Sequence, residues 1–105
     1  MRTYPFTNVA FAIVTGGVSP ITQRSRGIDT ITRVSAGIYD LTLLGGGIDQ
    51  NDCLDRPAVR VLGSVNPCIT ISHTSDTQKR VSISVAGLFS DADFTVILDR
   101  APLYN

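Results

Sequence analysis

The sequence predicts an all-β domain, and three features of composition and patterning point to that class. Val, Ile and Thr make up about 30% of the chain, and these β-branched side chains suit pleated sheets. All 9 acidic residues are Asp and Lys79 is the only Lys, so the charged residues that favour helices are almost absent. Polar and apolar residues alternate in several short runs, most clearly over 80–89, as they do in half-buried strands.

Seven such runs follow one another along the chain, separated by turn-forming residues. The first is interpreted as a strand and not as a signal peptide, because Pro5 and Asn8 break its apolar stretch. The second and third are joined by Ser35-Ala36-Gly37, which is typical of a hairpin. We therefore expect one domain over 1–105, an antiparallel β-sandwich or jelly-roll-like domain of about seven to eight strands. The expected strands are 6–14, 28–34, 38–44, 58–63, 68–73, 80–89 and 90–100.

The segment 15–27 lacks alternation and is rich in turn-forming residues, which predicts a long loop or an extended arm. It carries Arg24 and Arg26, and Arg33 follows in the next expected strand. Arginine often anchors protein interfaces, so Arg24, Arg26 and Arg33 are the candidate partner-binding residues. A solvated arm without a partner is the alternative for this segment.

The charge balance and the apolar runs exclude several classes of function. The formal net charge is +0 and there is no basic stripe, so we expect no nucleic acid as partner. No apolar run approaches the length of a membrane span, so we expect no membrane partner either. Gly45-Gly46-Gly47 lacks the Lys and the helix start of a phosphate-binding loop. It is interpreted as a flexible turn, and no cofactor is expected.

Three groups of residues are candidates for chemistry, and a structural role is expected for each. Asp91 and Asp93 fall on one side of an extended segment and would form the acid–base pair of a hydrolase, but charges at a strand start also protect a sheet edge. His73 is the only His, and no nucleophile–base pair can be assembled around it. The acidic segment 49–55 departs from EF-hand spacing, so a cation site and a solvated loop both stay open. We expect no catalytic residue and no metal site.

Cys53 and Cys68 are the only cysteines, and they lie 15 positions apart. That spacing matches neither a metal knuckle nor a disulfide-dense scaffold. Two buried free thiols and one disulfide bridge both fit the pattern, and the sequence does not decide between them.

The stretch GIDTITRVSAGIYDLTL, which begins at residue 27, resembles a segment of small β-structured virion proteins of tailed bacteriophages. The ending ADFTVILDR resembles the last strand of the same domains, so the resemblance covers about residues 27–100. The family comprises capsid decoration (cement) proteins, head fibres and the tips of tail fibres or spikes, which are commonly trimeric. The residues that carry the match are Gly27, Ile31, Arg33, Gly37, Tyr39 and Thr42.

The resemblance implies a non-enzymatic structural protein of the virion, which is assembled in the host cytoplasm. A small single β-domain without a fibrous shaft fits capsid decoration best. We therefore expect a homotrimer that binds the major capsid protein and stabilises the assembled head. The alternative is a receptor-binding or adhesion module of a tail fibre or spike, although the absence of Trp counts against a sugar-stacking platform.

Overall fold

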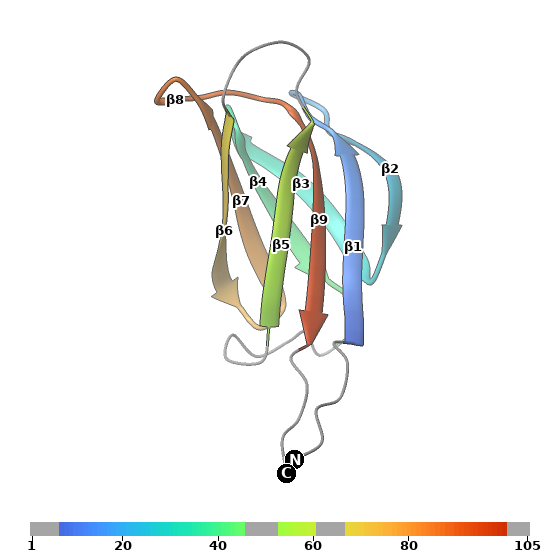
Figure 1. The fold of residues 1–105 in the computed structure, drawn as a ribbon. Coiled ribbons are helices and arrows are strands. Elements are labelled where there is room, and N and C mark those ends of the chain that lie inside the picture. Colours follow the sequence, from blue (N-terminus) through green and yellow to red (C-terminus); the bar gives the residue numbers. More distant parts are fainter. Residues whose placement is uncertain (1–6, 46–52, 61–66, 101–105) are drawn as a thin grey trace, which may run out of the picture.

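The protein folds into two antiparallel β-sheets that face each other as the layers of a β-sandwich (Figure 1). The computed structural model describes residues 7–45, 53–60 and 67–100. Within these ranges no helix is long and apolar enough to cross a membrane. The strands formed by the described residues are β1 (Thr7–Thr15), β2 (Ile21–Arg26), β3 (Ile28–Ser35), β4 (Ile38–Leu43), β5 (Cys53–Arg60), β6 (Pro67–Ser75), β7 (Gln78–Val85), β8 (Leu88–Phe89) and β9 (Asp93–Arg100).

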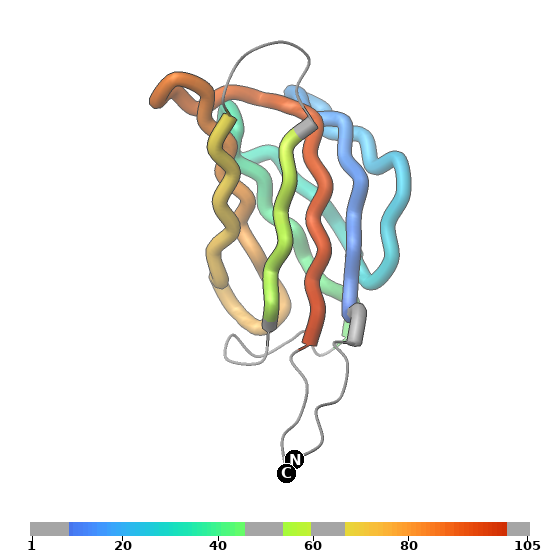
Figure 2. Tube along the Cα trace, viewed as in Figure 1, coloured from blue at the N-terminus to red at the C-terminus, as the bar shows by residue number. Residues whose placement is uncertain are grey.

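The first sheet has the strand order β2-β1-β9-β5, and the second has the order β3-β4-β7-β6, with β8 paired to β7. The earliest and latest strands in the chain, β1 and β9, lie side by side in the first sheet (Figure 2). Their pairing starts where Thr7 lies opposite Arg100. The all-β sandwich predicted from the sequence is therefore confirmed.

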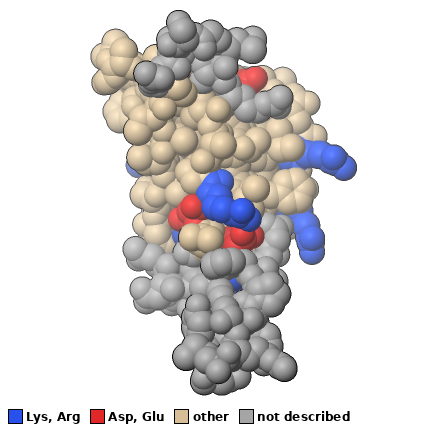
Figure 3. Space-filling view, in the orientation of Figure 1, with Lys and Arg blue, Asp and Glu red and all other residues tan. Residues whose placement is uncertain are grey.

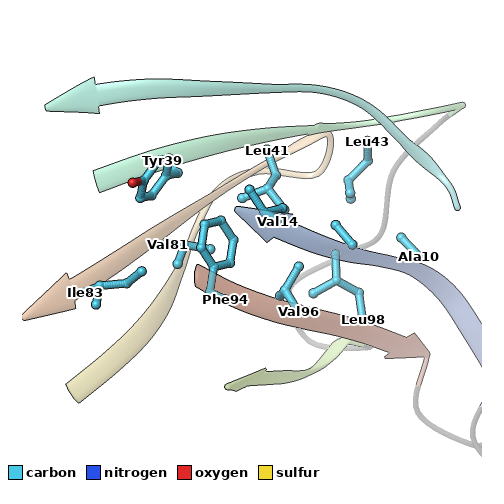
Figure 4. Packing of buried hydrophobic residues seen from close by; sticks show 11 residues of the cluster. Ala10, Val14, Tyr39, Leu41, Leu43, Val81, Ile83, Phe94, Val96 and Leu98 are labelled. Atoms are coloured by element: carbon cyan, nitrogen blue, oxygen red, sulfur yellow. The ribbon is translucent and has the colours of Figure 1, made fainter. Parts of the chain in front are cut away.

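The core lies between the two sheets and is formed by alternate residues of the central strands (Figure 4). Phe94, Val96 and Leu98 alternate along β9, and each is fully buried. The ring of Phe94 packs against Tyr39 from the opposite sheet, with ring centroids 5.0 Å apart. Tilted aromatic pairs of this kind add to the stabilisation that burial supplies. The other buried apolar residues are Ala10, Ala12, Val14, Leu41, Leu43, Val81 and Ile83.

The hairpin predicted around Ser35-Ala36-Gly37 is confirmed. β3 and β4 pair along their length, with Ile31 opposite Leu41, and Gly37 adopts a φ of +73°. The Gly37 carbonyl accepts a hydrogen bond of 2.7 Å from the N–H of Ile83. The turn is therefore tied to β7 as well as to its own hairpin.

One residue, Gly27, carries the chain from β2 in the first sheet to β3 in the second. Its φ is +73°, and a Cβ atom at this position would lie 2.5 Å from the carbonyl oxygen of Val9. Only glycine combines this backbone conformation with so close an approach. The glycine that opens the stretch GIDTITRVSAGIYDLTL therefore makes the corner between the sheets.

Three strands differ from the sequence expectation. The expected arm or loop over 15–27 is wrong in its second half, because Ile21–Arg26 forms β2 and pairs with β1. The expected strand over 80–89 is broken at Ala86 and Gly87, whose φ values of 53° and 81° turn the chain back into β8. β5 begins at Cys53, five residues before the expected strand, and it includes Pro57, which an edge strand tolerates.

Candidate partner-binding surface

The outer face of the first sheet carries an apolar strip that is bordered by arginines. Along one row Arg26 lies opposite Phe11, Phe11 opposite Ile97, and Ile97 opposite Arg56. The neighbouring row runs from Arg24 through Ile13 and Thr95 to Ala58. Residues directly opposite in adjacent strands point to the same side of a sheet. We call this surface, made of these eight residues, the outer face.

The side chains of the outer face are more accessible than those of the core. Phe11, Ile13 and Ile97 are each partly buried, whereas the residues next to them in sequence, such as Ala12 and Val96, are fully buried. Figure 3 looks onto this side of the molecule and shows a largely uncharged surface, with basic side chains at the β2 edge and a group of basic and acidic side chains near the centre. Aromatic residues and arginines around an apolar centre are the composition typical of protein interfaces.

Arg24 and Arg26, two of the three residues predicted to contact a partner, lie together on β2 at the border of the outer face. Every residue of β2 is exposed. The strand continues the first sheet beyond β1, and nothing in the described part of the second sheet covers it from the inner side. Two basic side chains are thereby held on a regular strand and not on a flexible arm.

Arg33, the third predicted residue, is not part of this surface. It lies on β3 in the second sheet, and its guanidinium pairs with Asp91, with 3.0 Å between Arg33 Nη2 and Asp91 Oδ2. A second hydrogen bond of 3.1 Å joins Arg33 Nε to the same oxygen. Arg33 is therefore engaged within the molecule, and the structure brings together Arg24 and Arg26 only.

Asp91 is the centre of a hydrogen-bonded cluster at the end of the sandwich. Besides the Arg33 guanidinium, its carboxylate accepts hydrogen bonds from the Gly37 N–H at 2.8 Å and from the Tyr39 hydroxyl at 2.7 Å. The Tyr39 hydroxyl in turn accepts a hydrogen bond from the N–H of Gly17 at 2.9 Å. Asp91 thus connects the β1–β2 loop, β3, the β3–β4 turn and β4.

The electrostatics of this cluster fix the protonation of both of its central groups. The Arg33 hydrogen bonds, followed by the donors Gly37 and Tyr39, lower the pKa of Asp91 to about 2 from 3.8. Burial, assisted by the bond to Asp91, raises the pKa of Tyr39 to about 12. Asp91 stays ionised and Tyr39 stays protonated at neutral pH, which suits a permanent tie between loops and not a proton-transfer step.

Asp91 and Asp93, the possible acid–base pair, accept hydrogen bonds from different partners. Asp93 Oδ1 accepts a hydrogen bond of 3.2 Å from the N–H of Gly16, while Asp91 holds Arg33, Gly37 and Tyr39. A carboxylate as acidic as Asp91 is a weak general base. Each carboxylate therefore accepts a hydrogen bond from a backbone N–H of a turn or loop.

The second charged cluster lies between the sheets and surrounds Lys79, whose side chain is 1% exposed. Its ammonium lies 3.6 Å from Asp55 Oδ2, which comes from the opposite sheet, and 3.2 Å from His73 Nδ1. His73 Nε2 lies 3.3 Å from Asp76 Oδ1. Because the ammonium donates to Nδ1, the imidazole proton belongs on Nε2, where Asp76 accepts it. His73 thus helps to satisfy a buried charge.

The structure describes only part of the remaining candidates, which are the acidic segment, the cysteines and the glycine turn. Of the acidic segment 49–55, residues up to 52 lie outside the described residues, and Asp55 contacts Lys79. The part of the chain that the structure describes contains no group of three His, Cys or carboxylate side chains placed to hold a metal ion. Cys68 is a free, exposed thiol and not a buried one. The side chain of Cys53 and the glycines at 46 and 47 lie outside the described residues.

Sequence reasoning missed Lys79 and Tyr39, and each had a signal in the strand alternation. Lys79 has the same parity as Val81 and Ile83, the apolar residues of the alternating run, which are fully buried. Tyr39 has the same parity as Leu41 within its strand.

No known protein family matches the chain, and neither a curated protein nor a solved structure does so.

Proposed function

We propose that the chain is a non-enzymatic structural protein of a bacteriophage virion, which binds the major capsid protein and stabilises the assembled head. The resemblance of the stretch between Gly27 and Thr42 to phage virion proteins supports the assignment to a virion. The outer face, where an apolar strip lies between arginines, supports binding and is the observation on which the proposal chiefly depends. A protein that binds only the assembled lattice stabilises it by mass action.

The same face suits a surface that docks onto a large, flat assembly. The four-stranded sheet holds Phe11, Ile13 and Ile97 in fixed positions, so little conformational entropy is lost on binding. Burial of such aromatic and aliphatic groups contributes about 25 cal/mol per Å² of apolar surface. The proposed homotrimer places three copies of this face around one axis, so that weak individual contacts act together.

The proposal is tested on particles produced from the genome that carries the coding sequence. Quantitative mass spectrometry of purified virions is expected to find the protein in many copies per particle, and cryo-microscopy is expected to place it on the head. Particles that lack the protein are then incubated with recombinant chain and sedimented. Absence of the protein from purified virions contradicts the proposal.

Two matched variants test whether the outer face makes the contact. Thr95→Glu introduces a charge between Ile13 and Ala58 on the outer face. Thr70→Glu introduces the same charge on an exposed position of β6 in the second sheet. We expect Thr95→Glu to lose co-sedimentation and Thr70→Glu to retain it, with both variants folded by circular dichroism. Equal binding by the two variants excludes the outer face.

A second candidate function, a receptor-binding or adhesion module of the tail, is favoured by a different feature. The β7–β8 hairpin presents Leu88 and Phe89 to solvent, with exposures of 72% and 59%, at the end of the sandwich where Asp91 ties the loops together. A module that binds end-on would use such apolar tips. Location of the protein on the tail, with loss of cell binding in Phe89→Ser, distinguishes this function from capsid decoration.

A further inference from the structure

β2 is an open edge of the first sheet. It pairs with β1 on one side, and no strand among the described residues pairs with its other side. The N–H and C=O groups on that side are therefore available to another chain. Edge strands of this kind are templates for the addition of a further strand unless they are protected.

Of the devices that usually prevent strand addition, proline is missing from β2, whereas a bulge and charged side chains are present. Its sequence ITQRSR contains no proline. Ile13 lies opposite Arg24 and Val14 opposite Thr22, so the register shift in this hairpin leaves Gln23 of β2 as the extra, unpaired residue of a bulge. The strand is six residues long, which is close to the length of an average strand. The bulge at Gln23 leaves Arg24–Arg26 in regular register with β1, and the charges of Arg24 and Arg26 restrict what can pair with this part of the strand.

Those two arginines differ from three others in the molecule in having no acidic partner. Arg33 and Arg56 pair with Asp91 and Asp99, respectively. Arg80 likewise pairs with Asp40 at 2.8 Å. No ion pair joins Arg24 or Arg26 to any described residue, although both are exposed. Two unpaired cations are thus placed next to unpaired backbone groups.

Their spacing determines what kind of strand fits. Arg24 and Arg26 are two positions apart, so both side chains point to the outer face. A strand added to β2 would place its own alternate residues directly opposite them, with Cβ atoms about 5 Å apart. Carboxylates at those positions can accept the paired N–H donors of each guanidinium.

A second copy of this chain does not fit the same edge. If two β2 strands paired about a two-fold axis with most of their length overlapping, Arg24 would lie opposite its own symmetry mate or diagonal to it. Like charges in cross-strand positions are destabilising. The charges of β2 therefore disfavour self-pairing and favour an acidic strand.

We propose that β2 is a docking edge for an extended acidic segment of a partner protein, which adds as a strand to the first sheet and pairs alternate carboxylates with Arg24 and Arg26. The inference rests on the proposed role as a binding module, but not on the identity of the particle. It specifies the chemistry of the partner, a run with Asp or Glu at every second position, and the manner in which it binds.

The experiment uses the full chain and a capped octapeptide of alternating valine and aspartate as the probe. Binding is followed by nuclear magnetic resonance of the ¹⁵N-labelled chain, together with hydrogen exchange of the β2 amides. We expect shifts and slowed exchange centred on Ile21–Arg26, with affinity that falls as salt is added. Because no particle is involved, failure of the virion proposal leaves this result unaffected.

Two control probes and two protein variants separate strand addition from non-specific attraction. A probe with lysine in place of aspartate, and an aspartate probe N-methylated at alternate positions, are both expected not to bind. Arg24→Ser with Arg26→Ser is expected to weaken binding about tenfold or more, whereas Arg80→Ser on the second sheet is expected to leave it unchanged.

Four results overturn the proposal. These are no binding of the aspartate probe, equal binding of the N-methylated probe, unchanged affinity in the double serine variant, and protection of the β2 amides by self-association in the absence of probe.

Discussion

The hydroxyl of Tyr39 donates a hydrogen bond of 2.7 Å to Asp91, which connects the interior of the second sheet to the segment that leads into β9. The same hydroxyl accepts a hydrogen bond from the Gly17 N–H. One phenol oxygen therefore holds two loops that lie far apart in the sequence.

Tyr39→Phe is expected to destabilise the protein by about 1–3 kcal/mol, because the Gly17 N–H loses its acceptor and Asp91 loses a donor. The change removes only the oxygen, so the ring packing against Phe94 is retained. Urea unfolding followed by circular dichroism measures the difference in free energy. Phe89→Tyr is the control. It adds a hydroxyl to a ring that is 59% exposed, and it is expected to change stability by less than about 0.5 kcal/mol. Equal effects of the two variants contradict the role given to the Tyr39 hydroxyl.

The pH dependence of stability is expected to reveal the lowered pKa of the Asp91 carboxyl group. Its pKa is about 2 in the folded protein against an ordinary value of 3.8. Because the folded value is depressed, its contribution is present above the ordinary value and is lost as pH falls through the folded value. Wild type is therefore expected to lose stability relative to Asp91→Asn as pH is lowered from about 4 to about 2.

Urea midpoints over this range measure the change, and Asp29→Asn provides the control at an exposed acidic residue of β3. That variant is expected to follow the wild-type curve. A constant difference between wild type and Asp91→Asn at all these pH values shows that the Arg33 ion pair does not depress the carboxyl pKa.

How far the sequence predicts the fold depends on whether a strand has one covered face. Phe94, Val96 and Leu98 alternate with polar or outward residues because one side of β9 is buried, and that strand was predicted correctly. β2 is exposed on both faces, so no alternation was selected in it and it was mistaken for an arm. Apolar and polar residues alternate in a strand because one of its faces is buried, and a strand without a buried face lacks this pattern.

The site residues follow the same logic. Arg24 and Arg26 were predicted as partner-binding residues from their residue type, and the structure places them together on β2. The contact between Tyr39 and Asp91 spans 52 positions, and no local pattern indicates a pair at that separation. Arg33 was grouped with the other arginines for the same reason, since its partner Asp91 is equally remote in the sequence.

Gly37→Ala is expected to be much more damaging than Gly45→Ala. Both glycines have nearly the same φ, +73° and +72°, but a Cβ on Gly37 would lie 2.4 Å from the Ile83 carbonyl oxygen, whereas a Cβ on Gly45 would have nothing within 4 Å. The Gly45 variant therefore measures the conformational cost alone, about 1–2 kcal/mol. The Gly37 variant adds displacement of the turn from β7. Thermal and urea unfolding compare the two, and similar losses contradict a steric role for the contact with Ile83.

Lys79 and Asp55 form a charged contact between the two sheets, and their coupling energy can be measured. Lys79 is almost completely buried while Asp55 keeps 21% of its side chain exposed. A double-mutant cycle with Lys79→Met and Asp55→Asn is expected to give a coupling of about 1–3 kcal/mol, because loss of either partner leaves a charge in a poorly solvated site.

The pair formed by Asp40 and Arg80 is the matched reference for this cycle. Arg80 is 43% exposed and the pair joins neighbouring strands of one sheet, so Asp40→Asn and Arg80→Met are expected to couple by less than about 1 kcal/mol. Both cycles are measured by urea unfolding under the same conditions. A coupling between Lys79 and Asp55 no larger than that of the reference pair shows that the buried ammonium is stabilised by other groups, of which His73, at 3.2 Å, is the nearest to test.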